Sequence, residues 1–185
     1  MELNKLSTQH SELRTSPPTA WHVAAFVEVS TLALWLGSMV FFSFVVAPSA
    51  FAVLPSRQLA GELVNSSIGK VETIGVLSGT LLILFQAFTW SSLRGASNLK
   101  VARLIALILM NAANAALRFW IAPAMARLRV QMGGTVDNVL ANDPVRVEFD
   151  RLHQYSVQLM GSMILLGILL LFLTVRFWMN RSAQG

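Results

Sequence analysis

The sequence contains no cysteine and little charge, and both absences restrict what the protein can be. With no Cys among its 185 residues, it has no disulfide bonds, thiolate metal sites or cysteine nucleophiles. Charged residues make up only 12% of the chain, whereas a soluble domain normally carries about 25%. Hydrophobic residues make up 55%. We interpret this balance as that of a chain whose surface mostly faces lipid.

Motifs for common chemistry are also missing. The sequence has no phosphate-binding loop, hydrolase elbow or zinc motif, so we assign no catalytic residue and no metal site. Its 14 Lys and Arg residues outnumber its 9 acidic residues, but they are scattered through short loops. This distribution suits contact with anionic lipid headgroups. It argues against nucleic-acid binding.

Four apolar spans predict the fold, at residues 23–46, 72–92, 103–126 and 155–178. A membrane crossing needs about 20 apolar residues, because ~30 Å of hydrocarbon is crossed at 1.5 Å per residue. Only helices satisfy their own backbone hydrogen bonds in such a span. The predicted fold is therefore an all-α, integral membrane four-helix bundle in a multi-pass protein of the cell membrane.

The segments outside these spans are predicted as follows. Residues 1–20 are polar and lack the features of a signal peptide, so we predict a disordered tail before a transmembrane domain at 21–179. Residues 180–185 form a C-terminal tail. Basic residues are nearly balanced between the two sides, so the positive-inside rule decides little. The short basic loop "SSLRGASNLKVAR" leads us to expect both termini in the cytoplasm.

Two helical segments are predicted outside the bilayer. Residues 55–65 carry Leu59 and Leu63 on one edge, which predicts a short helix lying at the membrane interface. Asp143 followed by Pro144 is typical of a helix start. The last helix is therefore predicted to begin outside the bilayer at 144–154 and to continue into the fourth span.

An internal repeat is one interpretation of two similar segments. "FVVAPSAFAVL" and "FWIAPAMARLR" share an aromatic residue and Ala-Pro at an offset of 75, and this offset also relates Glu28 to Arg103. A parallel duplication of a helical hairpin explains the match. A chance match in apolar sequence is the alternative, because the second and fourth spans align poorly.

The chain resembles a known family in four stretches. They are "ALWLGSMVFFSFVVAP", "LPSRQLAGELVN", "NAALRFWIAPAMARLR" and "FDRLHQYSVQLM". Together they resemble the transmembrane-protein-205-like family, a bacterial domain of unknown function, over roughly residues 24–178. The most specific residues are Trp35, Leu36, Gly37, Asn114, Arg118, Pro123, Arg151, His153 and Ser156. The resemblance implies a four-helix membrane protein without an established activity.

A fainter resemblance concerns cofactors. Copper-resistance-D-like proteins and HemJ-type haem-biosynthetic oxidases share a His followed by Trp-x-Gly in their first helix. Here His22 lies thirteen residues before Trp35, further than that pattern expects. No cofactor is therefore predicted, and haem or copper is the alternative that this resemblance implies. His22 and His153 begin helices at opposite membrane faces, so they cannot share a metal ion.

Polar residues inside the apolar spans are the candidate site. Asn111, Asn114 and Arg118 lie on one stripe of the third helix, and buried polar groups in a bilayer should face the bundle. Glu72 and His153 fall near the same membrane face. We predict a polar pocket lined by these five residues. Two interpretations of Arg118 remain open: an anion or proton site, or an arginine that snorkels to the headgroups or fixes packing.

Two prolines and one charge pair complete the candidates. Pro48 and Pro123 cannot donate backbone hydrogen bonds, so both should kink their helices. Glu28 is expected to pair with Arg103 inside the membrane; a protonated or proton-transferring glutamate is the alternative.

The predicted function is a small binding or transport-type module with its pocket near Arg118, and the sequence favours a protein that is not an enzyme. One alternative is a haem-, copper- or quinone-linked oxidoreductase. Another is a structural partner of a second membrane protein or of its own copy, through the small residues Gly75 and Gly79.

Overall fold

The structure, a computed structural model, describes residues 19–90, 97–134, 136 and 139–182. Within these ranges the chain forms four long helical rods, each long and apolar enough to cross a membrane. The first rod is α2 (Thr19–Phe41), η1 (Phe42–Val46) and α3 (Ala47–Val53), and the second is α4 (Arg57–Thr89). The third rod is α5 (Ser97–Ala116), η2 (Leu117–Ile121) and α6 (Ala122–Gln131), and the fourth is α7 (Pro144–Ser182). The predicted all-α membrane bundle is confirmed. Most of the two predicted tails lies outside the described residues.

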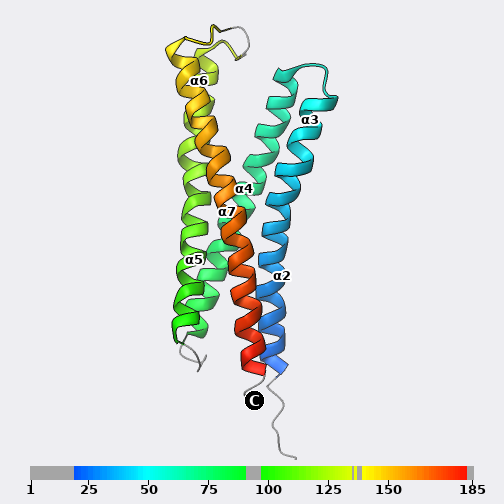
Figure 1. Ribbon diagram of the computed structural model, residues 1–185, viewed down its shortest axis with the longest axis vertical. Helices are drawn as coiled ribbons and strands as arrows, with labels where there is room; N and C mark the ends of the chain where they lie inside the picture. Colours follow the sequence, from blue (N-terminus) through cyan, green and yellow to red (C-terminus); the bar gives the residue numbers. More distant parts are fainter. Residues whose placement is uncertain (1–18, 91–96, 135, 137–138, 183–185) are drawn as a thin grey trace, which may run out of the picture.

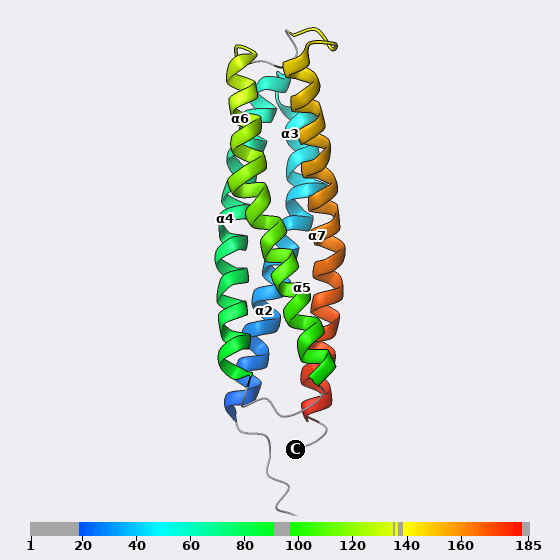
Figure 2. The ribbon, with the colours of Figure 1, turned by 90° about the vertical axis from the view of Figure 1, so that its left-hand side faces the viewer.

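The rods alternate in direction around the bundle. Both α2 and α5 pack against α4 and against α7, so α4 and α7 occupy opposite corners (Figures 1 and 2). The start of α2 and the end of α7 lie together, and we call this the terminal end. At the opposite, distal end, α3 stays beside α4 and α6 stays beside α7, and the two pairs lie apart (Figure 1).

The bundle is taller than the hydrocarbon layer. The 33 residues of α4 span about 50 Å at 1.5 Å per residue, compared with ~30 Å of hydrocarbon. Exposed apolar side chains recur on α4 from Ile74 to Phe88 and on α7 from Val157 to Met179. We therefore expect the parts of both helices that precede these runs to project beyond the hydrocarbon at the distal end.

The core is packed around small residues of α4. Trp35 is 3% exposed and lies against Gly75, where an added Cβ would meet its Nε1 at 2.5 Å. Gly79 is similarly covered by Trp35 and Asn111. These glycines therefore hold the bundle itself together. The surface that suggested a second membrane protein as a partner is buried inside the monomer.

Paired π-helical turns mark the repeat. η1 and η2 start at Phe42 and Leu117, at the offset of 75, and each is followed by Ala-Pro. The Ala47 N–H donates to the Phe42 carbonyl, five residues back. In the third rod, the Ala122 N–H donates to the Leu117 carbonyl in the same way. A proline ring clashes with the carbonyl four residues before it. The wider π turn leaves room for the rings of Pro48 and Pro123, the two prolines that were expected to kink their helices.

The second and fourth rods also match, but at a different offset. Gly79 of α4 lies against Trp35, and Gly167 of α7 lies against Met110. Met110 follows Trp35 by 75 residues, whereas Gly167 follows Gly79 by 88. The offset changes because the connection before α7 is longer than that before α4. These contacts support the duplication, and they explain why a single offset aligned the second and fourth spans poorly.

The prediction of a separate interfacial helix at 55–65 is wrong. α4 runs from Arg57 to Thr89 without interruption, and the Ser56 hydroxyl caps it by accepting from the Leu59 N–H at 3.2 Å. Ala60 is 1% exposed, so this first part of α4 is already packed into the bundle. Tertiary packing therefore continues the helix through Gly61 and Gly69, where local propensity favours a break.

The prediction of a long last helix from Pro144 is confirmed. The Asp143 carboxylate accepts from the Val145 N–H at 2.8 Å, as expected for a helix N-cap. α7 then continues to Ser182. In the loop before it, Gly133 and Gly134 have φ angles of 74° and 90°, a conformation that glycine adopts without strain.

Candidate functional site

A pocket of about 310 Å³ lies between α4 and α7 at the distal end. Each helix contributes one stripe of side chains at i, i+4, i+7 and i+11, the spacing of one helical face. The α4 stripe is Gly61, Asn65, Ile68 and Glu72, and the α7 stripe is Phe149, His153, Ser156 and Met160. Each α7 residue follows its α4 equivalent by 88 residues. The pocket therefore lies between matched faces of α4 and α7, one from each repeat, and we call it the inter-repeat pocket.

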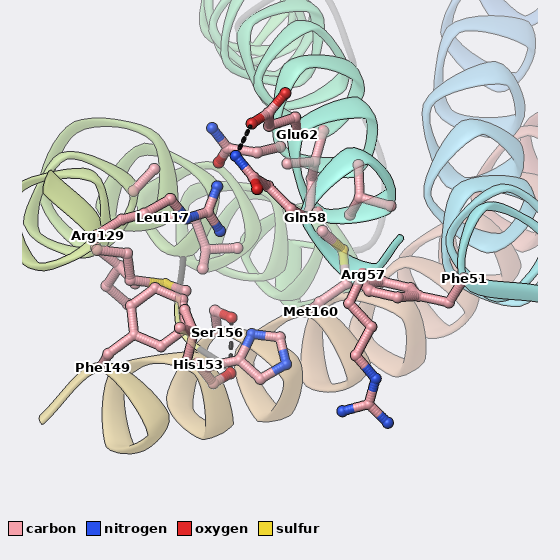
Figure 3. A pocket seen from close by; sticks show the side chains of 18 of the residues that line it. Phe51, Arg57, Gln58, Glu62, Leu117, Arg129, Phe149, His153, Ser156 and Met160 are labelled. Carbon is pink, nitrogen blue, oxygen red and sulfur yellow. Dashed lines mark hydrogen bonds between the residues drawn. The ribbon is translucent and has the colours of Figure 1, made fainter. Parts of the chain in front are cut away.

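The third rod closes one side of this pocket with apolar side chains. Leu117, Ile121, Ala122 and Met125 line it from η2 and α6. Met160 of α7 contributes a further apolar surface (Figure 3). Most of the wall is thus apolar, as in typical small-molecule sites.

Charged and polar side chains surround the opening (Figure 3). The Arg129 guanidinium lies over the Phe149 ring, 5.6 Å from its centroid, and this ring stacks on His153 at 6.5 Å. Gln58 donates to Glu62 at 3.1 Å on the opposite wall. The aromatic stack therefore holds a cation at the rim, a position that the sequence did not indicate.

Glu72 lies at the inner end of the pocket and is 4% exposed. One of its carboxyl oxygens, Oε2, has no hydrogen-bond partner among the described residues. Buried polar atoms normally have a partner in protein or ordered water. Glu72 therefore offers a hydrogen-bond acceptor to a water or ligand that enters the pocket.

Arg118 lines a second hollow instead, on the outside of the bundle between α4 and α6. Its Nε donates to the Thr73 hydroxyl at 3.0 Å. His153 does not reach this hollow, which we call the outer groove, whereas Glu72 lines both. The structure thus separates Arg118 from His153, although the sequence placed them in one pocket.

The two asparagines line neither hollow. Asn114 donates to the Glu72 carbonyl at 2.9 Å, and Asn111 donates to the Thr80 hydroxyl at 3.2 Å. Asn111, Asn114 and Arg118 therefore all bond α4, as a single polar stripe should. The contacts of the asparagines join α5 to α4 and do not extend the pocket.

The structure brings Glu28 and Arg103 together in a buried ion pair near the terminal end. Trp178 donates to the other Glu28 oxygen at 2.8 Å, and Arg103 donates to the Thr174 hydroxyl at 3.3 Å. Phe177 lies under the guanidinium at 4.1 Å. The cluster joins α2, α5 and α7. Its partners on α7 could not be foreseen, because the alignment of that helix was not established.

The histidines lie far apart. His22 is in the first turns of α2, whose neighbour Trp21 contacts Trp178 at 6.3 Å between ring centroids. His153 lies 25 residues before Trp178 on α7, or roughly 37 Å at 1.5 Å per residue. Within the described ranges, no group of three His, Asp or Glu side chains is arranged to hold a metal ion.

Comparison with known proteins identifies the family. Residues 30–133 match the family described as "Domain of unknown function (DUF4149)", which covers more than half of the chain, so the chain belongs to this family. The match includes most of the first repeat and the third rod. No curated protein and no solved structure matches the chain.

Proposed function

We propose that this membrane protein of the family of unknown function is a binding and transport-type module for a small organic anion with an apolar body. The observation that carries the proposal is the inter-repeat pocket, whose walls are apolar while its rim holds Arg129. A pocket of about 310 Å³ is within the range of small-molecule sites.

Two arginines of the pocket, Arg129 and Arg57, favour an acidic group at the opening. Among the described residues, none of the ion pairs includes Arg129. Arg57 lies at the other side of the opening and also lines the pocket. A guanidinium binds a carboxylate or phosphate through two parallel hydrogen bonds. The apolar part of such a ligand would then lie against Leu117 and Met160.

The position of the pocket favours transport over simple storage. Many transporters place their substrate between two structural repeats and move the repeats relative to each other. Here each repeat also contains a π turn before a proline, at Pro48 and Pro123. Such turns are frequent at functional sites and at bends in helices. With both termini in the cytoplasm, as the sequence leads us to expect, the pocket opens on the outer side of the membrane.

Binding of a fluorescent fatty acid tests this proposal. Dansyl-undecanoic acid is titrated into the purified protein in dodecyl maltoside, with its methyl ester as the uncharged probe. In Gly61→Phe, the new ring occupies the pocket, because an added Cβ at Gly61 has its nearest neighbour, Arg129, at 3.9 Å. We expect at least tenfold weaker binding of the acid. Arg129→Gln should weaken binding of the acid about tenfold and leave the ester unchanged, because one charge-assisted bond is lost.

Gly161→Phe is the matched control. Gly161 is an exposed helical glycine of α7 with no neighbour within 4 Å of an added Cβ. The Gly161→Phe variant should bind both probes as the unaltered protein does. If Gly61→Phe and Gly161→Phe bind the acid equally, the fatty acid does not use the inter-repeat pocket and the proposal fails.

A further inference from the structure

The outer groove has a different character from the inter-repeat pocket. It is a hollow of about 680 Å³ on the outside of the bundle, between α4 and the third rod. Lys70 and Thr73 of α4 and Arg118 of η2 supply its polar surface, and Ile74 and Pro123 are among its apolar lining. Two of these side chains are cationic. The groove therefore combines positive charge with a surface that continues into lipid.

Arg118 is held in a fixed orientation in this groove. Its Nε donates to the Thr73 hydroxyl at 3.0 Å, and that hydroxyl donates in turn to the Gly69 carbonyl at 2.8 Å. Among the described residues, this is the one hydrogen bond of the guanidinium, so both terminal nitrogens keep their donors for another group. Thr73 thus orients the planar fork that recognises phosphate in a bidentate manner.

The depth of the groove matches the level of lipid phosphates. The closely spaced run of exposed large apolar side chains on α4 begins at Ile74, directly after Thr73, and Leu59 and Leu63 are the exposed ones before it. Next to Arg118 on the third rod, Phe119 is 67% and Trp120 is 77% exposed. Tryptophan at such a position is typical of the membrane–water interface. Lys70 and Arg118 therefore lie at the border of the hydrocarbon at the distal end.

We infer that the outer groove binds a phosphate group, with Arg118 as the bidentate ligand and Lys70 as a second cation. The phosphate comes from an anionic phospholipid of this leaflet or from inorganic phosphate, and both present the same charged oxygens. The inference does not depend on the proposed function, because neither cation lines the inter-repeat pocket.

Glu72 provides a second test of the inference, in which the expected effect on phosphate binding is opposite. Its buried carboxyl also lines the outer groove and interacts electrostatically with Arg118. A carboxylate that lines the same groove repels a bound phosphate. Glu72→Gln should therefore tighten phosphate binding, whereas Arg118→Gln should weaken it. Non-specific binding of anionic lipid to a basic membrane protein would not give these two opposite responses.

Native mass spectrometry of the detergent-purified full chain tests the site. Phosphatidylglycerol and phosphatidylcholine are titrated separately into the protein and into three variants. We expect Arg118→Gln to bind phosphatidylglycerol at least tenfold more weakly and Glu72→Gln to bind it several-fold more tightly. Arg127→Gln is the control, because Arg127 is an exposed arginine of α6 that lines neither hollow. It should bind as the unaltered protein does.

Competition identifies the source of the phosphate. If millimolar inorganic phosphate displaces phosphatidylglycerol, the groove recognises the phosphate alone. If it does not, the lipid is the ligand. Equal binding by Arg118→Gln and the unaltered protein, or an equal loss in Arg127→Gln, would overturn the inference. Should Arg118→Gln fail to fold by circular dichroism, Lys70→Gln replaces it, with at least a threefold loss expected.

Discussion

Replacing Glu28 by glutamine tests the buried ion pair, because this change removes one charge and almost no volume. Arg103 is 1% exposed and would keep its full charge with only Thr174 and the Phe177 ring beside it. Removing one partner of a buried pair costs about 3–5 kcal/mol. The new amide retains an oxygen for the Trp178 N–H, so we expect the lower end of that range.

This cost converts into a measurable change in melting temperature. For a chain of this length, each kcal/mol lowers Tm by about 2–4 °C, so Glu28→Gln should lower Tm by roughly 6–12 °C. Circular dichroism at 222 nm in dodecyl maltoside follows the unfolding. In the double variant Glu28→Gln/Arg103→Met no charge is left unpaired, so its loss should be smaller than the sum of the single losses by at least ~2 kcal/mol.

An exposed ion pair of the same residue types provides the control. Arg151 and Glu148 pair on the surface of α7, where water screens both charges. Glu148→Gln should leave Tm unchanged. If Glu28→Gln also leaves Tm unchanged, or if the two changes at Glu28 and Arg103 are additive, then the pair does not stabilise the fold and the reasoning is refuted.

Two further predictions concern packing and capping. An added methyl group at Gly79 would meet Trp35 at 2.9 Å, so Gly79→Ala should destabilise the protein by about 1–3 kcal/mol through overpacking. Gly37→Ala, into open space, should be neutral or stabilise by up to ~1 kcal/mol, and equal melting temperatures would contradict the close packing. Asp143→Ala removes the N-cap of α7 and should cost about 1 kcal/mol, measured by the same thermal unfolding; no change in Tm would show that the cap is dispensable.

The sequence predicted the helices well because their cause is local. A run of about 20 apolar residues has few stable structures other than a membrane helix. Three of the four spans lie within long helices, and the second span lies in one as far as Thr89. The start of α7 was predicted for the same reason, since Asp143 and Pro144 act within one turn. The break expected after residue 65 failed, because the packing of Ala60 is a tertiary effect that local propensity does not contain.

For the candidate site, the sequence indicated only how far along the helices its residues lie. Glu72, Arg118 and His153 do lie toward the distal end, as their distances along the helices implied. Their positions around the bundle depend on which helices are neighbours, and sequence periodicity does not give this. Arg118 lines only the outer groove and His153 lines only the inter-repeat pocket, although the two hollows share Asn65, Ile68 and Glu72 of α4. The cation at the rim, Arg129, was missed because it follows the apolar span and reads as an ordinary headgroup contact.

The residue differences between the two repeats have a consequence for ligand recognition. A pocket between two copies of one hairpin would have identical walls, so a ligand would meet the same groups in either orientation. Here a single chain carries both hairpins, and all four matched wall positions differ. Glycine corresponds to phenylalanine, asparagine to histidine, isoleucine to serine and glutamate to methionine, at Gly61/Phe149, Asn65/His153, Ile68/Ser156 and Glu72/Met160. The two walls are therefore chemically different, so the pocket can distinguish the two ends of a ligand.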